Sequence, residues 1–168
     1  VLYITLEMAE EKIAERIDAN LLDVPIKQLS DPLFTKQQFR NKVDKLHQKT
    51  KGRLVIKEYP TASAHVNHFK SLLNELSMKR GFAPDNVFID YLNICASARF
   101  KGNIVNSYTL VKGIAEELRG LAVEHNVPIV TATQTTRSGY GSSDVDITDT
   151  SESFGLPATA DLMFALIS

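Results

Sequence analysis

Cysteine is nearly absent from this chain of 168 residues, and tryptophan is missing altogether. The single cysteine, Cys95, cannot form a disulfide within the chain, which excludes a disulfide-stabilised fold and favours a reducing compartment. The longest uninterrupted apolar run, residues 162–167, is far shorter than the roughly 20 residues of a membrane helix. No signal-peptide pattern opens the chain. We therefore expect a soluble protein of the cytoplasm, with no membrane partner.

Charge of one sign is also lacking, because 19 Lys and Arg residues nearly balance 20 Asp and Glu residues, for a formal net charge of −1. This balance gives no overall attraction to nucleic acids, so any contact with DNA must be local. Hydrophobic residues make up 43% and charged residues 23% of the chain, which is ordinary for a globular protein and excludes intrinsic disorder. A chain of this length can bury a sizeable core, and we expect residues 1–168 to form a single domain unit.

Short apolar strands alternate with amphipathic helices along the chain. The expected strands cover residues 1–6, 54–59, 87–92, 128–134 and 162–167. The expected helices cover residues 8–22, 35–50, 66–81 and 111–125. Strands that are apolar throughout are typical of a parallel sheet buried under helices on both faces, so the predicted fold class is α/β.

Three of the expected strands end in a side chain suited to chemistry. Asp90 can hold Mg²⁺ through water, or it can simply cap the turn that follows. Glu7 can orient or deprotonate a water, or it can favour the dipole of the next helix as a first-turn acid. Gln134 has an amide that both donates and accepts, although a neutral residue there is unremarkable. Because ligands bind at the carboxyl ends of parallel strands, the three residues together predict a site.

Two polar loops carry cations close to aromatic residues. Residues 135–150 form the longer loop, which is rich in Ser, Gly and Asp and contains Arg137 and Tyr140. The loop after the third strand has Arg99 and Lys101 on either side of a phenylalanine. Such combinations suit single-stranded nucleic acid, through phosphate contact and base stacking. The alternative, that both loops are simply solvated, stays open.

Five sequence motifs follow one another along the chain. They are Tyr-Ile-Thr-Leu-Glu-Met at residues 3–8, Val-Phe-Ile-Asp-Tyr-Leu at 87–92, Ile-Ala-Glu-Glu-Leu-Arg-Gly-Leu-Ala at 114–122, Val-Pro-Ile-Val at 127–130 with Gln134, and Asp-Thr-Ser-Glu-Ser at 149–153 running to Ala160 and Asp161. In this order they resemble the motor domain of DnaB-type replicative DNA helicases, in particular its T-even phage branch. The similarity spans nearly the whole chain.

The resemblance implies a RecA-like fold and ATP hydrolysis with Mg²⁺. It also implies a ring of six subunits that translocates on single-stranded DNA and unwinds duplex at a bacteriophage replication fork, with primase and a helicase loader as partners. By the same resemblance Glu7 is the catalytic glutamate, Asp90 is the Walker B aspartate, and Gln134 couples the γ-phosphate to DNA. The segment 149–155 helps to line the central channel. Its candidate DNA contacts are Glu152, Ser153 and Gly155, whereas Ser151 stands where many cellular relatives have an arginine.

Two parts of the family pattern are lacking. The chain contains no Gly-x-x-x-x-Gly-Lys-Ser/Thr phosphate loop, whose expected place is before Val1. The basic finger that the family offers to a neighbouring subunit is expected beyond Ser168. We therefore expect the middle of a RecA-like motor domain, inactive by itself and truncated at both ends.

The resemblance also predicts a strand order. It places 54–59 at one edge, followed by 1–6, 87–92 and 128–134. The strand that feeds the phosphate loop belongs between 128–134 and 162–167. Without it we expect either the last strand to move and close the gap, or the open edges to pair with another copy.

Two other functions fit the residues. One is a strand-exchange recombinase or another RecA-like ATPase, which would use the same strand-end Glu, Asp and Gln. The other is a non-catalytic interaction module built on an α/β scaffold that binds no nucleotide.

Overall fold

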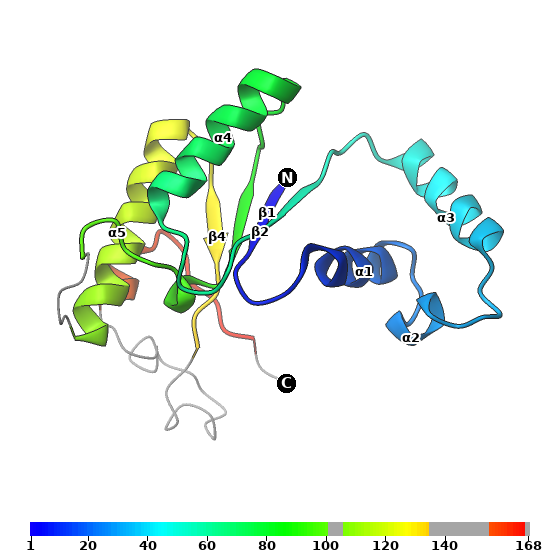
Figure 1. Ribbon diagram of the computed structural model, residues 1–168, viewed down its shortest axis with the longest axis horizontal. Coiled ribbons are helices and arrows are strands. Elements are labelled where there is room, and N and C mark those ends of the chain that lie inside the picture. The colour runs from blue at the N-terminus through cyan, green and yellow to red at the C-terminus, as the bar shows by residue number, and fades with distance from the viewer. Residues whose placement is uncertain (101–105, 135–154, 167–168) are drawn as a thin grey trace.

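Four parallel strands form the central sheet of the computed structural model, which describes residues 1–100, 106–134 and 155–166. The strands are β1 (Leu2–Thr5), β2 (Val55–Glu58), β3 (Val87–Asp90) and β4 (Ile129–Thr131), and they lie in the order β2-β1-β3-β4 (Figure 1). The register aligns Thr5 with Glu58 on one side and with Asp90 on the other. The predicted class and strand order are both confirmed, although β4 is shorter than the expected 128–134.

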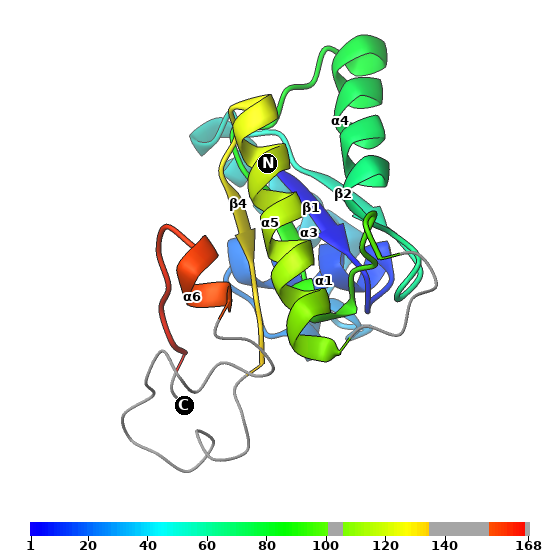
Figure 2. The same cartoon turned by 90° about the vertical axis from the view of Figure 1, so that its left-hand side faces the viewer.

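Helices lie on both sides of this sheet. They are α1 (Glu10–Leu21), α2 (Ile26–Leu29), α3 (Lys36–Lys49), α4 (Val66–Arg80), α5 (Ser107–His125) and α6 (Gly155–Thr159), with a 3₁₀ turn, η1 (Leu92–Ile94), after β3. α4 and α5 cover one face, while α1 lies on the other side and α3 stands away from the sheet (Figures 1 and 2). The four predicted helices are confirmed within a few residues, whereas α2, α6 and η1 were not predicted. No helix of the described residues has the length and apolarity that a membrane span requires.

Local side-chain contacts explain where the longer helices begin and end. The Thr35 hydroxyl accepts the backbone N–H of Gln38, whose side chain in turn accepts the N–H of Thr35, so α3 starts with a capping box. The Asn106 side chain accepts the N–H of Thr109 at 2.8 Å and caps α5. α4 ends at Gly81, which has a φ of 54°, a left-handed conformation that glycine adopts without a Cβ clash.

Histidines take the capping role at the start of α4. Nδ1 of His65 accepts the backbone N–H of Asn67, and Nδ1 of His68 accepts the backbone N–H of His65. These contacts satisfy backbone donors that the first turn of a helix leaves without an intrahelical partner. The pair of histidines at this position is therefore part of a helix start.

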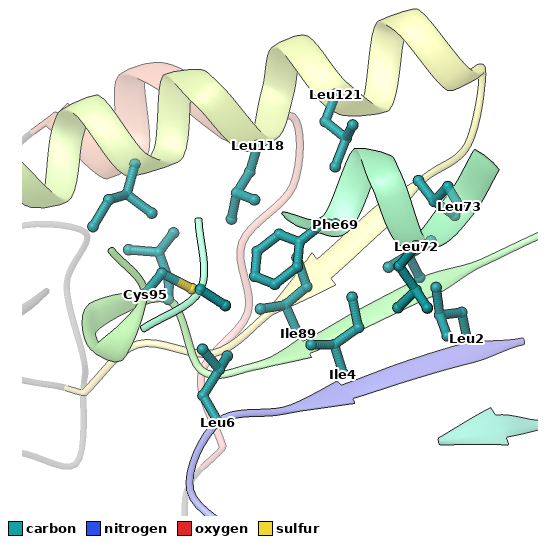
Figure 3. Close-up of a cluster of buried hydrophobic side chains, with 14 of the residues drawn as sticks. Leu2, Ile4, Leu6, Phe69, Leu72, Leu73, Ile89, Cys95, Leu118 and Leu121 are labelled. Atoms are coloured by element: carbon teal, nitrogen blue, oxygen red, sulfur yellow. The ribbon is translucent and has the colours of Figure 1, made fainter. Parts of the chain in front are cut away.

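The hydrophobic core lies between the sheet and the helices α4 and α5 (Figure 3). Leu2 and Ile4 of β1 point into it and are fully buried, whereas Tyr3 between them is only half-buried on the opposite face. This alternation follows from the pleat of a strand. The side chains that meet those of β1 and β3 from the helices are Phe69, Leu72, Leu73, Leu118 and Leu121. Burial of this apolar surface is the main force that fixes α4 and α5 on the sheet.

The predicted strand at 162–167 is wrong for the residues that can be described. Residues 162–166 contain no strand, and their side chains face solvent, with Leu166 92% exposed. β4 pairs with β3 alone among the described residues. An apolar run forms a strand only where a neighbouring strand completes its hydrogen bonds, and no described strand does so here. The expected closure of the sheet by this segment is therefore not seen, and pairing with a second copy stays a prediction.

Candidate nucleotide site

The carboxyl ends of β1, β3 and β4 lie next to one another and carry the three predicted site residues. Asp90 is the last residue of β3 and aligns with Thr5 of β1, two residues before Glu7. The N–H of Leu6 donates to the carbonyl of Asp90 at 2.9 Å, so the segment after β1 stays paired with the end of β3. Gln134 follows β4 on the other side of β3. The fold therefore brings all three residues to one edge of the sheet.

Asp90 is half-buried, and its carboxylate has a partner in the neighbouring strand. The hydroxyl of Tyr3 donates to Oδ2 of Asp90 at 2.9 Å. The Tyr3 ring in turn stacks on Phe88, with 6.2 Å between the ring centroids and 14° between the planes. Burial, followed by the hydrogen bond to Asp90 and its negative charge, raises the pKa of Tyr3 to about 12. Sequence reasoning missed this contact, because Tyr3 looked like one more aromatic residue of a strand.

The turn that carries Glu7 is held by threonines. The Thr5 hydroxyl donates to the carbonyl of Met8 at 2.8 Å and accepts the N–H of Met8 at 3.1 Å. The Thr61 hydroxyl donates to the carbonyl of Leu6 at 2.6 Å. The Glu7 side chain itself is exposed and makes no hydrogen bond or ion pair to any described residue. Its backbone is therefore fixed while its carboxylate stays available.

A pair of glutamates anchors the start of α1 just after this turn. The backbone N–H of Glu58 donates to Oε1 of Glu10 at 2.8 Å, and the backbone N–H of Glu10 donates to Oε2 of Glu58 at 3.2 Å. This reciprocal arrangement joins α1 to the end of β2 and satisfies one donor of each element. The Glu7 turn is consequently held on both sides.

The segment after β4 is tied to the segment after β3. Nε2 of Gln134 donates to the hydroxyl of Tyr91 at 3.2 Å, and Tyr91 is the residue next to Asp90. The hydroxyl of Thr133 donates to Oδ1 of Asn93 at 2.8 Å. A movement of the Gln134 amide can therefore displace Tyr91, the residue next to Asp90, through a single hydrogen bond. No hydrogen bond or ion pair joins Glu7 to either Asp90 or Gln134 among the residues described.

The loop after η1 is held on α5 by a buried carboxylate. Glu117 is only 7% exposed, accepts the Ser97 hydroxyl at 2.5 Å and accepts the backbone N–H of Ala98 at 2.9 Å. Arg99 is exposed, and its Nη1 lies 2.7 Å from Oε2 of Glu116. The proposed DNA contact at Arg99 is thus accessible but already paired. Sequence reasoning missed Glu117, since nothing in the helical pattern separates it from the half-buried Glu116.

Two glycines let the neighbouring segments pack closely on α5. A Cβ at Gly113 would lie 2.6 Å from the Phe100 ring, and one at Gly155 would lie 2.7 Å from the Lys112 side chain. Gly155, a predicted DNA contact, is buried at the start of α6. The other predicted DNA contacts lie outside the described residues: Lys101, Arg137, Tyr140, Glu152 and Ser153.

The donor set at this edge fits Mg²⁺ held mainly by water and phosphate. No described group of three or more His, Cys, Asp or Glu side chains could enclose a metal ion. Mg²⁺ does not need such a cage, because it keeps much of its water and commonly uses one or two carboxylates together with substrate phosphates. Asp90 has one oxygen engaged by Tyr3 and the other without a described hydrogen-bond partner. That arrangement suits a carboxylate that receives a metal-bound water.

Sequence comparison relates the chain to known helicases. The family model of the DnaB-like helicase C-terminal domain matches residues 1–167. A DnaB-like replicative helicase of Enterobacteria phage T4 is 51% identical over 168 residues, which are 99% of this chain and 35% of that protein. The chain therefore spans about a third of the length of this curated relative.

Two solved structures share the fold. A DnaB-like replicative helicase, described together with its interactions with primase, has a TM-score of 0.72 and 19% identity, covering 95% of this chain and 38% of that one. A solved ATPase domain has a TM-score of 0.73 and 19% identity, covering 96% of this chain and 57% of that one. At this identity the two structures support the fold alone.

Proposed function

The chain belongs to the family of DnaB-like helicase C-terminal domains, and from that premise we propose that it is the core of an ATP-driven motor in a phage-type replicative DNA helicase. The observation that carries the proposal is the strand order β2-β1-β3-β4, which brings Glu7, Asp90 and Gln134 to one edge. Identity of 51% to a phage replicative helicase supports the biological role.

Each residue at the edge has a role in this proposal. Asp90 receives the water shell of Mg²⁺, which neutralises charge on the phosphates of ATP when it is bound. Glu7, with its carboxylate unengaged, orients a water and takes its proton as the water attacks the terminal phosphate. Gln134 donates a hydrogen bond from its amide nitrogen to an oxygen of the γ-phosphate and passes its displacement to the polar loop that follows. Its contact with Tyr91 supports a link between the amide and the metal-site strand.

The proposed partners of the complete helicase subunit are single-stranded DNA, five further copies in a ring, a primase and a helicase loader. The primase is proposed from membership of the family, and a solved structure of the same fold is described with its interactions with primase. The proposed place of action is the host cytoplasm. Candidate DNA contacts are carried by the loop of Arg99 and Lys101 and by the segment 135–155, which includes Arg137.

The nucleotide site can be tested in the complete helicase subunit by replacing one strand-end residue at a time. Glu7→Gln should lower ATP turnover by about a hundred- to ten-thousandfold, because it removes the base but keeps the shape. Asp90→Asn should abolish Mg²⁺-dependent nucleotide binding. Gln134→Ala should leave nucleotide binding intact but remove stimulation of turnover by single-stranded DNA. Turnover that survives Glu7→Gln would refute the assigned site.

The DNA contacts can be tested through their salt dependence. If Arg99 touches a phosphate, Arg99→Ala should lower the slope of log affinity against log salt by about 0.7 for a single strand. Arg137→Ala should have a similar effect. Lys79→Ala is a matched control, because Lys79 is an exposed cation paired with Glu75. It lies in the last turn of α4, which leads into the start of β3 and not to the carboxyl end that carries Asp90. An unchanged slope for both arginine variants would show that neither Arg99 nor Arg137 contacts a DNA phosphate.

The two competing functions make different predictions. A recombinase would bind nucleotide and DNA but would not unwind a forked duplex. A non-catalytic module would show no affinity for ATP even in the complete subunit. Forked-duplex unwinding and ATP binding, measured on the same preparation, therefore separate the three possibilities.

A further inference from the structure

We propose that Tyr3 is a positioning residue that orients the Asp90 carboxylate for its magnesium-bound water. This inference rests on the proposed role of Asp90. It assigns a function to a hydroxyl whose one described hydrogen bond goes to that carboxylate, at 2.9 Å between the hydroxyl oxygen and Oδ2.

The parallel register places the two residues for this contact. Tyr3 of β1 aligns with Phe88 of β3, and Asp90 is two residues further along β3 on the same face of the sheet. A long side chain such as tyrosine can reach this diagonal neighbour. Stacking on Phe88 holds the ring in place, so the hydroxyl is presented from a fixed position. The contact depends on a backbone pairing of neighbouring strands and on a packed ring.

The chemistry of a phenol suits this task better than that of a cation. A lysine or arginine next to Asp90 would compete with Mg²⁺ for the negative charge. A phenol donates one hydrogen bond and carries no charge at neutral pH, so it selects an orientation and leaves the charge for the metal. Because Oδ2 is engaged, Oδ1 is the oxygen left to accept a water of the metal shell. Partners of this kind orient metal ligands and alter metal affinity.

A purely structural role for Tyr3 needs only the ring. The aromatic stack with Phe88 would survive in Tyr3→Phe, which removes one oxygen atom and nothing else. The two roles therefore separate cleanly in this variant. If the hydroxyl matters for the metal, the Mg²⁺ dependence must change while the fold remains.

The test uses the complete helicase subunit and a fluorescent, non-hydrolysable ATP analogue as the probe. Binding is titrated with Mg²⁺, and separately measured in EDTA. For Tyr3→Phe we expect the half-saturating Mg²⁺ concentration to rise about tenfold, with unchanged binding in EDTA. ATP turnover should recover toward that of the unsubstituted protein at high Mg²⁺, a rescue that general loosening of the fold would not give.

Tyr59→Phe is the matched control, because it removes the phenol hydroxyl of another half-buried tyrosine. Tyr59 follows the end of β2, and β1 separates it from β3 and Asp90. Its Mg²⁺ titration should overlay that of the unsubstituted protein. Thermal unfolding checks both variants, and loss of a single oxygen should lower the midpoint by only a few degrees. A Mg²⁺ curve for Tyr3→Phe that matches the unsubstituted protein, or an equal shift in both variants, overturns the inference.

Asp90→Asn distinguishes failure of this inference from failure of the proposed function. If Asp90→Asn loses Mg²⁺-dependent binding but Tyr3→Phe does not change it, only the role of Tyr3 is wrong. If Asp90→Asn binds the Mg²⁺ complex like the unsubstituted protein, the proposed site at Asp90 is wrong, and the role of Tyr3 is lost with it.

Discussion

The two faces of the sheet differ in how they are packed. On the face under α4 and α5, Ile4 and Ile89 are almost completely buried. On the opposite face, Tyr3 and Phe88 are half-buried, and Val130 is 37% exposed. The same strands supply both sets, because successive side chains of a strand point to opposite faces. One sheet therefore presents a packed face and an open one.

This difference separates stability from chemistry. Asp90 and its partner Tyr3 lie on the open face, while the fully buried aliphatic side chains of the same strands lie on the packed face. A side chain on the packed face contributes the full free energy of apolar burial, whereas one on the open face contributes only part of it. We expect substitutions on the packed face to unfold the protein and those on the open face to alter its function.

The largest effect should come from truncating a buried side chain on the packed face. Ile89→Ala should lower the free energy of unfolding by about 3 to 4 kcal/mol, through lost apolar burial and the cavity left behind. Phe88→Ala, one residue away on the open face, should cost about 1 to 2 kcal/mol although it removes more atoms. Urea denaturation of both variants measures the difference. An equal or larger loss for Phe88→Ala would show that the open face is packed after all.

The next largest effect should come from removing the buried carboxylate of Glu117 on α5, one of the two helices that cover the packed face. Glu117→Ala should cost about 2 kcal/mol, because it leaves the Ser97 hydroxyl and the Ala98 N–H without their partner. Glu116→Ala breaks only an exposed ion pair with Arg99 and should change stability by less than about 0.5 kcal/mol. The two adjacent glutamates are matched controls for each other in a urea titration. Similar values for both would contradict the assigned burial.

A smaller effect should follow from removing helix caps. Asn106→Ala should lower the free energy of unfolding by about 1 kcal/mol, because α5 is part of the core and its first turn loses an acceptor. Thr35→Ala removes a comparable cap from α3, which has no buried residue. Its main result should be a loss of helical circular dichroism signal before global unfolding. Equal global destabilisation by both variants would mean that α3 is coupled to the core.

The thiol of Cys95 lies in the packed core and should have the smallest effect on stability near neutral pH, where it is protonated in both the folded and the unfolded chain. Burial, and secondarily the charge of Glu117, raises the pKa of Cys95 from 9.0 to about 12. At pH 8 this shift leaves about a thousandfold less thiolate than an ordinary cysteine would have. Alkylation by iodoacetamide should therefore be very slow until urea unfolds the chain.

The sign of the pH dependence follows from the direction of this shift. Because the folded pKa lies above the unfolded value, the buried thiol contributes stability that is present below the unfolded pKa and is lost as the pH rises through the folded one. Rapid alkylation of the native protein at pH 8 would show that the thiol is accessible and ionised.

Much of the fold could be predicted because its elements have strong local signals. Apolar strands and helices with a regular stripe indicated the class, and the resemblance to DnaB-type motor domains predicted the strand order β2-β1-β3-β4. The failure at residues 162–166 has a physical reason. An apolar run signals a strand only if a neighbour completes its hydrogen bonds, and that neighbour cannot be read from the run itself. The short helices α2 and α6 were missed because four or five residues show no period.

The candidate site was predicted only as a set of positions. Glu7, Asp90 and Gln134 could be found because polar residues that follow apolar strands stand out. Their neighbours could not, since the contact of Tyr3 with Asp90 depends on the strand register.

The sequence by itself determined which residues stand at the strand ends, because apolar strands and amphipathic helices can be recognised from the spacing of apolar residues within each segment. It also determined the family, because the motifs occur in a specific order along the chain. Only the tertiary structure decided that Tyr3 reaches Asp90, that Gln134 reaches Tyr91 and that Glu117 is buried whereas Glu116 is not. Those facts depend on the pairing of residues far apart in the chain, and such pairing is fixed by register and packing.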